Sequence, residues 1–152
     1  MKVMIVCTGN ICRSAMAQWL MKKKLEDANR EDIQVFSCGI FAYDKDMASQ
    51  EAIEVMQEYG VDLKQHEATN IQKSKIQQMD YVFCMTNSQK YTVLNQYPEL
   101  AGRVYTLKEF ATPDAQDLEI KDPWGYTIAV YRVCAAEIDS CLDKVIEKLP
   151  KQ

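Results

Sequence analysis

Short apolar runs alternate along this chain with segments that have helical spacing. The runs are rich in β-branched residues, which is typical of strands, and they cover residues 2–6, 33–38, 80–85 and 103–107. The other segments repeat apolar side chains every three or four residues, as helices do, and they cover residues 14–28, 48–59, 88–97 and 126–149. This alternation predicts an α/β fold, in which a parallel sheet carries helices on both faces.

The length and the apolar runs bound the organisation of the chain. A chain of 152 residues is long enough to bury its own core, so we expect a single domain spanning residues 1–152. Every continuous apolar run is far shorter than the roughly 20 residues of a membrane-spanning helix, and the residues after Met1 do not form a secretory signal. We therefore expect a cytoplasmic protein that has no membrane partner.

Charge and residue counts exclude further classes of function. A net charge of -4 argues against nucleic-acid binding, because affinity for the phosphate backbone needs clustered Lys and Arg. The single histidine, His66, excludes multi-histidine metal sites, and we expect neither a metal nor another cofactor. Six cysteines in a chain without a secretory signal are expected to be reduced thiols.

The turn after the first predicted strand has the composition of an anion site. It leads into a predicted helix and consists, in order, of Cys7, Thr8, Gly9, Asn10, Ile11, Cys12, Arg13 and Ser14. Ligands of open α/β sheets bind where strands turn into helices. The backbone N–H groups of residues 8–14, which we call the cradle, and the positive end of the helix suit a phosphate. The Arg13 guanidinium can bind two phosphate oxygens at once.

The same turn holds a candidate nucleophile, Cys7. A helix N-terminus and a nearby cation favour the thiolate form of a cysteine. The Ser14 hydroxyl can donate a hydrogen bond to that thiolate while it caps the helix. We expect Gly9 and Asn10 to adopt left-handed backbone conformations, which both residue types tolerate. Together these residues predict attack of a thiolate on a bound phosphoryl group.

The sequence resembles the low-molecular-weight protein tyrosine phosphatases over nearly its whole length. The family signature CxGNxCRS matches residues 7–14, and SCG at 37–39, DYVFCM at 80–85, VYTL at 104–107 and a late Asp-Pro pair match as well. The resemblance implies a flavodoxin-like domain with a four-stranded parallel sheet of order 2-1-3-4. It also implies metal-independent hydrolysis of phosphorylated proteins in two steps through a cysteinyl-phosphate, with inorganic phosphate and vanadate as inhibitors.

A proton donor is required, because an expelled phenolate or alkoxide is a poor leaving group near neutral pH. The aperiodic segment 111–125 offers the carboxylates Asp114, Asp117, Glu119 and Asp122. Only Asp122 precedes a proline, and in the family the aspartate of this Asp-Pro pair is the general acid. The resemblance thus implies Asp122 as acid, Cys7 as nucleophile and Arg13 as phosphate ligand, helped by the cradle residues Thr8, Gly9, Asn10, Ile11, Cys12 and Ser14.

Apolar side chains near these residues are candidates for the walls of a substrate cleft. Trp124 follows the acid where the family usually has an aromatic residue, while Phe41 and Tyr43 lie on the loop after the second predicted strand. We expect these rings to hold a flat substrate ring between them. Ile11 adds an apolar wall within the cradle.

The identity of Ile11 bears on the choice of substrate. The stretches GIFA at 39–42 and VYTLKEF at 104–110 resemble a bacterial subgroup that contains protein-arginine phosphatases, in which threonine matches Ile11. Ile11 has no hydroxyl and a bulkier apolar side chain, which favours an aromatic ring. We therefore favour phosphotyrosine, with phosphoarginine as the alternative.

Two further functions would also use such a cradle. Arsenate reduction in similar proteins needs two more cysteines in mid-chain, whereas only Cys84 lies there and the next cysteine is Cys134. A non-enzymatic phosphate- or flavin-binding module would need neither a reactive thiol nor a loop acid. We favour neither, and we expect the four cysteines outside the turn to pack in the core.

Cys12 and His66 each allow two interpretations. Cys12 can trap an oxidised Cys7 as a disulfide, which would guard Cys7 against irreversible oxidation, or it can simply fill space behind the loop. For His66 we expect a structural hydrogen bond near the cradle in preference to catalysis, because the mechanism already has a nucleophile, an anion ligand and an acid.

Overall fold

The inner strand β1 (Lys2–Cys7) separates two hydrophobic cores. Its side chains alternate between the two faces of the sheet, as the two-residue period of a strand requires. Val3, Ile5 and Cys7 are buried in one core, and Met4 and Val6 are buried in the other. A strand that is apolar on both faces is typical of a parallel sheet covered by helices on both sides.

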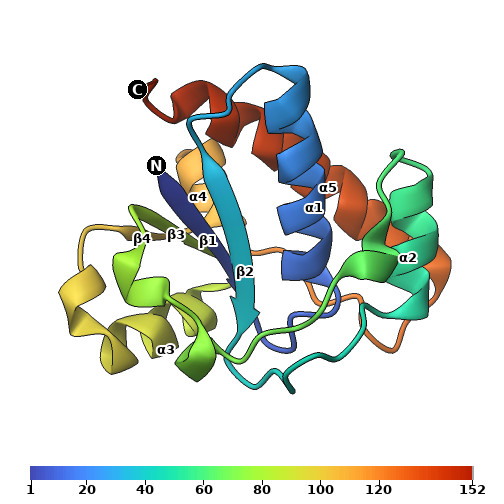
Figure 1. Cartoon of the computed structure of the whole chain (residues 1–152), viewed down its shortest axis with the longest axis horizontal. Helices are drawn as coiled ribbons and strands as arrows, with labels where there is room; N and C mark the ends of the chain where they lie inside the picture. The colour runs from blue at the N-terminus through green and yellow to red at the C-terminus, as the bar shows by residue number, and fades with distance from the viewer. Residues whose placement is uncertain (152) are drawn as a thin grey trace.

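The computed structural model describes residues 1–151, and a four-stranded sheet runs through its middle (Figure 1). β2 (Gln34–Gly39), β3 (Tyr81–Cys84) and β4 (Val104–Thr106) join β1 in the order β2-β1-β3-β4, and all neighbouring pairs are parallel. The predicted single α/β domain and its strand order are confirmed. Gln152, the last residue of the predicted domain, lies outside the described residues.

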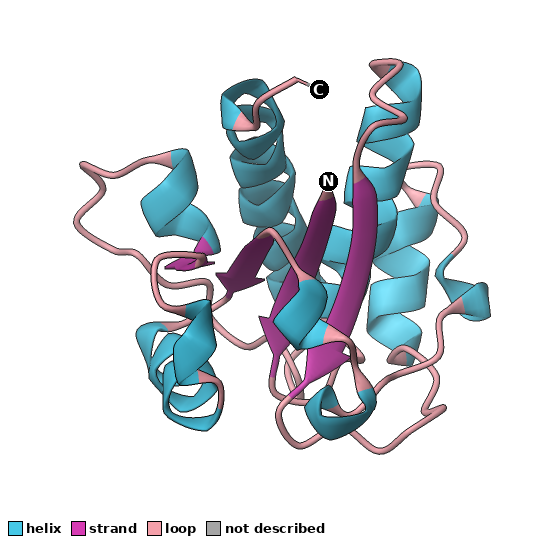
Figure 2. Cartoon of the chain, turned by 60° about the vertical axis from the view of Figure 1, so that its left-hand side comes forward, coloured by secondary structure: helices cyan, strands magenta, loops and turns pink. Residues whose placement is uncertain are grey.

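Helices cover both faces of the sheet (Figure 2). The core around Val3 is closed by α1 (Arg13–Asp27), α2 (Gln50–Gln57), α4 (Leu107–Ala111) and α5 (Ile128–Lys148). The core around Met4 is closed by α3 (Asn87–Gln96) together with short 3-10 turns at Ile71–Lys73, Ile76–Gln78 and Pro98–Leu100. Because α1 follows directly after β1, its positive N-terminus lies at the carboxyl end of the sheet.

The predicted helices are confirmed to within two residues at each end. α4 was not predicted, because the apolar run 103–107 reads as one strand. β4 ends instead at Thr106, whose hydroxyl accepts the backbone N–H of Glu109 (3.0 Å) while the Glu109 carboxylate accepts the N–H of Thr106 (2.8 Å). This reciprocal capping box starts a helix at Leu107.

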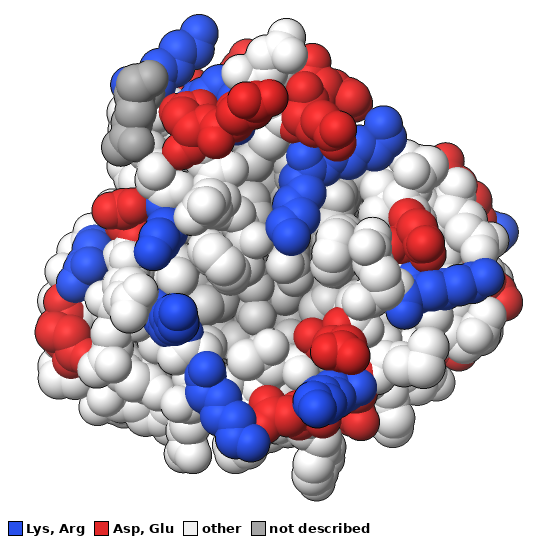
Figure 3. Space-filling model, in the orientation of Figure 1, with Lys and Arg blue, Asp and Glu red and all other residues white. Residues whose placement is uncertain are grey.

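Acidic and basic side chains are interspersed on the surface, as the face in Figure 3 shows. Several are paired, such as Lys24 with Asp139 and Asp143, each at 2.7 Å. On this face Lys and Arg are scattered among acidic and uncharged residues and do not gather into one basic patch. Within residues 1–151 no helix has the length and apolar character needed to cross a membrane.

Candidate active site

The cradle turns from β1 into α1 through one left-handed residue. Asn10 adopts the predicted conformation, with φ 56°. Gly9 does not, so that prediction is wrong, because a single left-handed residue already turns the loop. A glycine is required instead at Gly39, at the end of β2, where a Cβ would lie 2.6 Å from the Thr8 carbonyl oxygen and 2.9 Å from the Asn10 nitrogen.

The side chain of Asn10 ties the cradle to neighbouring elements. Its Oδ1 accepts the backbone N–H of Thr69 (3.0 Å), which identifies the other amide atom as the donor. Nδ2 accordingly donates to the hydroxyls of Ser14 (2.8 Å) and Ser37 (2.9 Å). Asn10 is fully buried, so these bonds hold the left-handed turn between β2, α1 and the loop before the 3-10 turn at Ile71–Lys73.

Cys7 ends β1 with its sulfur inside the cradle. The Sγ lies 2.8 Å from the Ser14 Oγ and accepts the backbone N–H of Asn10 at 3.3 Å. Because the Ser14 oxygen already accepts a bond from Asn10, its own proton is available to the Cys7 sulfur, so two hydrogen-bond donors meet at that sulfur. Ser14 does not cap α1 as predicted, because the helix begins one residue earlier and Cys12 occupies the N-cap.

The guanidinium of Arg13 is buried and is held by a backbone contact. Arg13 is 4% exposed, and its NH1 donates to the Ile120 carbonyl (2.8 Å). Ile120 is fixed in turn, because its N–H donates to the carbonyl of Met85 after β3 (2.9 Å). Arg13 Nε finds no hydrogen-bond partner in the described part of the chain. An unpaired buried donor is costly, and an oxyanion in the cradle would satisfy it.

Asp122 is the loop carboxylate that approaches Arg13. Its Oδ2 lies 3.6 Å from the Arg13 NH2, and its side chain is 52% exposed. Its Oδ1 accepts the backbone N–H of Trp124 (3.1 Å), and Gly125 follows with φ 86°, a left-handed conformation that glycine adopts readily. The carboxylate is thus oriented by its own loop and remains open to water.

A cavity of about 230 Å³ brings these groups together. It is lined by Cys7, Thr8, Gly9, Ile11, Cys12, Arg13, Asp122 and Trp124. The predicted nucleophile, anion ligand and acid therefore border one space, although they come from two distant segments of the sequence. The other candidate acids of the loop do not line it, namely Asp114, Asp117 and Glu119.

The aromatic residues expected to form cleft walls fall into two groups. Trp124 lines the cavity, whereas Phe41 and Tyr43 do not, and they are 74% and 78% exposed. Their loop is nevertheless adjacent to the cradle, because the Phe41 N–H donates to the Thr8 carbonyl (2.9 Å). Contacts of these two rings with a ligand would therefore lie beyond the cavity.

The Cys12 thiol faces polar partners behind the cradle. Its Sγ lies 3.2 Å from the Tyr131 hydroxyl and 3.4 Å from the Ser49 hydroxyl. Burial raises the pKa of the Cys12 thiol, so it stays protonated near neutral pH. The cysteines outside the turn are free and buried, as predicted, and they are Cys38, Cys84, Cys134 and Cys141.

His66 forms the expected structural hydrogen bond to the cradle. Its Nδ1 accepts the indole N–H of Trp19 (2.9 Å), so its Nε2 carries the proton and donates to the Asn10 carbonyl (2.7 Å). Only the neutral ring can make both bonds. Burial lowers the pKa of His66, which agrees with a neutral ring at this position.

This neutral histidine predicts a pH-dependent stability. In the unfolded chain His66 takes up a proton below about pH 6.5, whereas in the folded protein its lowered pKa delays protonation. The stabilisation is therefore fully present above about pH 6.5 and is lost as pH falls through the folded pKa, with a slope of up to about 1.4 kcal/mol per pH unit. The measurement is the free energy of unfolding in urea for wild type and His66→Gln between pH 5 and 7.5. If this free energy changes with pH equally steeply in the two proteins, His66 is not the cause of the pH dependence.

Several residues that build the site were not found from the sequence. Ile120 acts through a backbone carbonyl, which every residue possesses, so no signal marks it. The spacing of Thr86 and Gln89 is that of a capping box, and this sequence signal could have drawn attention to Gln89. In the structure the Gln89 amide also donates to the Thr8 hydroxyl (3.2 Å). Hydroxyl groups contributed by distant elements carried no such signal, namely those of Ser37, Ser49 and Tyr131.

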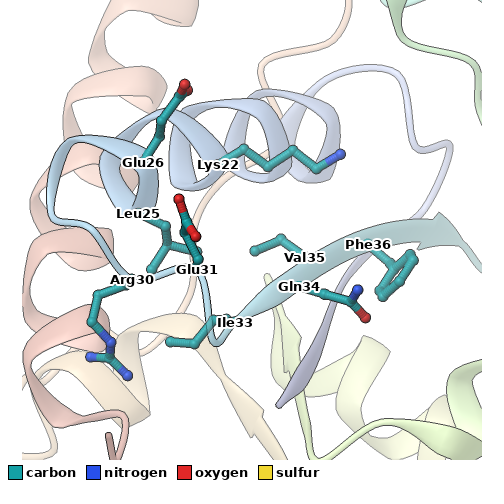
Figure 4. Close-up of a pocket in the computed structure, with 9 residues that line it drawn as sticks. All are labelled: Lys22, Leu25, Glu26, Arg30, Glu31, Ile33, Gln34, Val35 and Phe36. Carbon is teal, nitrogen blue, oxygen red and sulfur yellow. The ribbon is translucent and has the colours of Figure 1, made fainter. Parts of the chain in front are cut away.

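A separate groove lies where α1 meets the start of β2 (Figure 4). It measures about 420 Å³ and is lined by Lys22, Leu25, Glu26, Arg30, Glu31, Ile33, Gln34, Val35 and Phe36. It is at the opposite end of the sheet from the cradle, because β2 begins beside the first residue of β1 and the cradle follows the last. Its Arg30 guanidinium is already bound by Asp32 and by the Pro150 carbonyl.

Comparisons with known proteins match this chain over nearly its whole length. Residues 2–152 match the family model described as low molecular weight phosphotyrosine protein phosphatase. A protein-arginine-phosphatase of Geobacillus stearothermophilus is 34% identical over 148 residues, which are 97% of this chain and 95% of the relative.

Solved structures extend the comparison. A low molecular weight protein tyrosine phosphatase from T. tengcongensis is 39% identical with a TM-score of 0.90, over 98% of this chain and 99% of its own. An arginine phosphatase, solved as a cysteine-to-serine mutant with a phosphorylated active-site serine, is 30% identical with a TM-score of 0.91, over 98% and 95% of the two chains. The names of these relatives are divided between tyrosine and arginine phosphatases.

Proposed function

The chain belongs to the low molecular weight phosphotyrosine protein phosphatase family and is a cysteine-dependent phosphatase, and we propose that it hydrolyses phosphotyrosine in proteins. The observation that carries the proposal is the shared cavity, which the Cys7 sulfur, Arg13 and the Asp122 carboxylate all border. A thiolate, an anion ligand and a proton donor are the groups that phosphoryl transfer to a cysteine requires.

In the first step the Cys7 thiolate attacks phosphorus. A sulfur–phosphorus bond forms, the bond to the tyrosine oxygen breaks, and Asp122 gives its proton to the departing oxygen. Hydrogen bonds from Ser14 and Asn10 hold the Cys7 sulfur in the cradle before attack. Arg13, through its unpaired Nε–H, and the backbone N–H groups of the cradle hold the other phosphoryl oxygens.

In the second step water attacks phosphorus in the phosphocysteine. The Asp122 carboxylate accepts a proton from that water, the sulfur–phosphorus bond breaks, and phosphate leaves a regenerated Cys7 thiolate. Asp122 suits this role because its side chain is half exposed and water reaches it. The phosphorylated serine of the related arginine phosphatase supports a covalent intermediate at the position of Cys7. Inorganic phosphate and vanadate would compete for the same cradle.

Two apolar side chains of the cavity favour an aromatic substrate. Ile11 and Trp124 both line the space next to Cys7, and neither offers a carboxylate or another hydrogen-bond acceptor to a guanidinium. Phosphoarginine is the second candidate, because relatives with about a third of their residues identical are named arginine phosphatases. The difference between the two reactions is whether a phosphorus–oxygen or a phosphorus–nitrogen bond breaks.

We expect Ile11→Thr to move the preference toward phosphoarginine. The change removes apolar contact with a ring and adds a hydroxyl, and differences of this size alter specificity by about 10–200-fold. The measurement is kcat/KM on matched phosphotyrosine and phosphoarginine peptides. Ile11→Val is the control, since it reduces the side chain without adding a hydroxyl. An unchanged preference in Ile11→Thr would eliminate Ile11 as a determinant of the substrate.

The exposed rings around the cavity extend the proposed cleft. We assign Trp124 to the wall beside the substrate ring, because it lines the cavity directly after the acid. We assign Phe41 and Tyr43 to the outer part, where they would contact residues that flank the phosphorylated side chain. Their exposure and the hydrogen bond from Phe41 to the cradle support this assignment.

We further propose that Cys12 guards Cys7. Peroxide converts the Cys7 thiolate into a sulfenic acid, the Cys12 sulfur attacks it, and water leaves as a disulfide forms. Both residues line the same cavity, and Tyr131 and Ser49 hold the Cys12 thiol meanwhile. Mass spectrometry after mild peroxide is expected to find a Cys7–Cys12 disulfide that thiols reverse with return of activity. Sulfinic acid at Cys7 without any disulfide would count against the guard.

The remaining assignments follow from this chemistry. The partners are phosphorylated proteins, and the setting is a reducing one such as the cytoplasm, because the proposed chemistry requires Cys7 to stay reduced. Arsenate reduction is not favoured, since Cys84 lies in β3 and Cys134 lies in α5. A phosphate- or flavin-binding module is not favoured either, because binding alone needs neither a nucleophile nor an acid, whereas Cys7 and Asp122 line the same cavity.

A further inference from the structure

One side chain connects the first turn of α3 with the cradle. Gln89 is 6% exposed, and its Oε1 accepts the backbone N–H groups of Met85 (2.9 Å) and Thr86 (3.2 Å). Its Nε2 donates to the Thr8 hydroxyl (3.2 Å). The amide therefore joins the start of α3 to the residue that follows Cys7.

Part of this arrangement is a capping box, in which the Thr86 hydroxyl accepts the Gln89 N–H (3.2 Å). A capping box works with Glu as well as with Gln. This chain provides an example at α4, where Glu109 has the equivalent position and forms an ion pair with Lys90 (3.0 Å). The cap alone therefore does not explain why residue 89 is an amide.

The neighbouring cradle does explain the amide. A carboxylate has no N–H to donate to the Thr8 hydroxyl. It would also place a negative charge one hydrogen bond away from Thr8, which lines the cavity together with Cys7 and Arg13. There it would oppose both the thiolate and a bound phosphoryl group.

Thr8 depends on its neighbours for a fixed position. It is an exposed residue at the opening of the cradle, and its carbonyl is held by the Phe41 N–H (2.9 Å) on one side. Gln89 holds its hydroxyl on the other side. The bond from Phe41 fixes the peptide unit between Thr8 and Gly9, whose N–H is one of the cradle donors, and the bond from Gln89 fixes the Thr8 side chain.

We propose that Gln89 is a positioning residue for phosphate binding, whose neutral amide fixes Thr8 and keeps negative charge away from the cradle. The proposal rests on the proposed function, in which the cradle binds a phosphoryl group. It makes Gln89 a part of anion recognition although it does not line the cavity.

The test compares the dissociation constant of inorganic phosphate in wild type, Gln89→Glu and Glu109→Gln. Gln89→Glu keeps the acceptor of the capping box, so its melting temperature stays close to wild type. We expect its dissociation constant at pH 7 to rise about tenfold through repulsion between like charges. As pH falls to 5 the introduced carboxyl takes up protons, and the dissociation constant of the variant approaches that of wild type. Glu109→Gln makes the reverse change in the other capping box and leaves phosphate affinity unchanged.

A second comparison tests whether Gln89 acts through Thr8. Gln89→Met is expected to weaken phosphate binding in wild type but to add no further loss in a Thr8→Val background, because the contact is already absent there. Equal losses in both backgrounds would show that Gln89 does not act through Thr8 and would overturn the proposal. A folded Gln89→Glu that binds phosphate like wild type at pH 7 would reduce Gln89 to a helix cap. If wild type itself binds no inorganic phosphate, the proposed function fails first and this proposal fails with it.

Discussion

Cys7→Ser is expected to abolish turnover while phosphate binding stays measurable. A serine hydroxyl is far less acidic than a thiol and a weaker nucleophile, so hydrogen bonds from Ser14 and Asn10 do not turn it into an alkoxide. Loss of an enzyme nucleophile lowers kcat by roughly 10⁶-fold. Arg13 and the backbone donors are unchanged, so the dissociation constant of inorganic phosphate changes little. Steady-state kinetics on a phosphotyrosine peptide and calorimetry with phosphate give the two values.

The matched control for this variant is Cys141→Ser. Cys141 is a free, buried cysteine on α5, is 8% exposed and does not line the cavity. We expect it to retain the kcat of wild type. If Cys7→Ser turned over substrate as fast as Cys141→Ser, Cys7 would not be the nucleophile.

Asp122→Ala is expected to slow hydrolysis most for substrates with basic leaving groups. Without the acid the leaving oxygen departs as an anion, and a positioned general acid contributes about 10²–10⁴-fold. An aryl phosphate whose phenol is strongly acidic needs little protonation, so its first step is affected less. The measurement is kcat/KM across a series of aryl phosphates, plotted against the acidity of the phenol.

Asp114→Ala is the control for the loop charge. Asp114 belongs to the same loop, is exposed and does not line the cavity. Its removal is expected to leave kcat/KM unchanged for every substrate in the series. If kcat/KM of Asp122→Ala depended on the acidity of the phenol no more steeply than kcat/KM of wild type and Asp114→Ala, Asp122 would not be the general acid.

The elements that the sequence predicted correctly are those with a local cause. Apolar periodicity lies within each strand and helix, so their order and approximate ends could be inferred before the structure was known. The cradle is contiguous in the sequence, so Cys7 and Arg13 could be placed together. The errors at Gly9 and Ser14 arose because α1 begins at Arg13, one residue earlier than predicted, and because Asn10 alone makes the left-handed turn.

Contacts between distant segments could not be inferred in this way. The carbonyl that orients Arg13 belongs to Ile120, which is 107 residues away, and a backbone group leaves no trace in the residue type. The neutral state of His66 depends on the indole of Trp19, 47 residues away. Such pairings are fixed only when the helices pack on the sheet, so a sequence pattern can suggest a polar role without identifying its partner.

The proposed mechanism requires a phosphoryl group to pass through Cys7. The most direct test mixes Asp122→Ala with an aryl phosphate that has a good leaving group, stops the reaction with denaturant within the first turnover, and maps the protein by mass spectrometry. Because the variant lacks the base for the second step, a phosphoryl group is predicted on the peptide that contains Cys7, in an amount equal to the phenol released. Release of phenol with no phosphorylated protein, or with phosphate on another residue, would contradict the account.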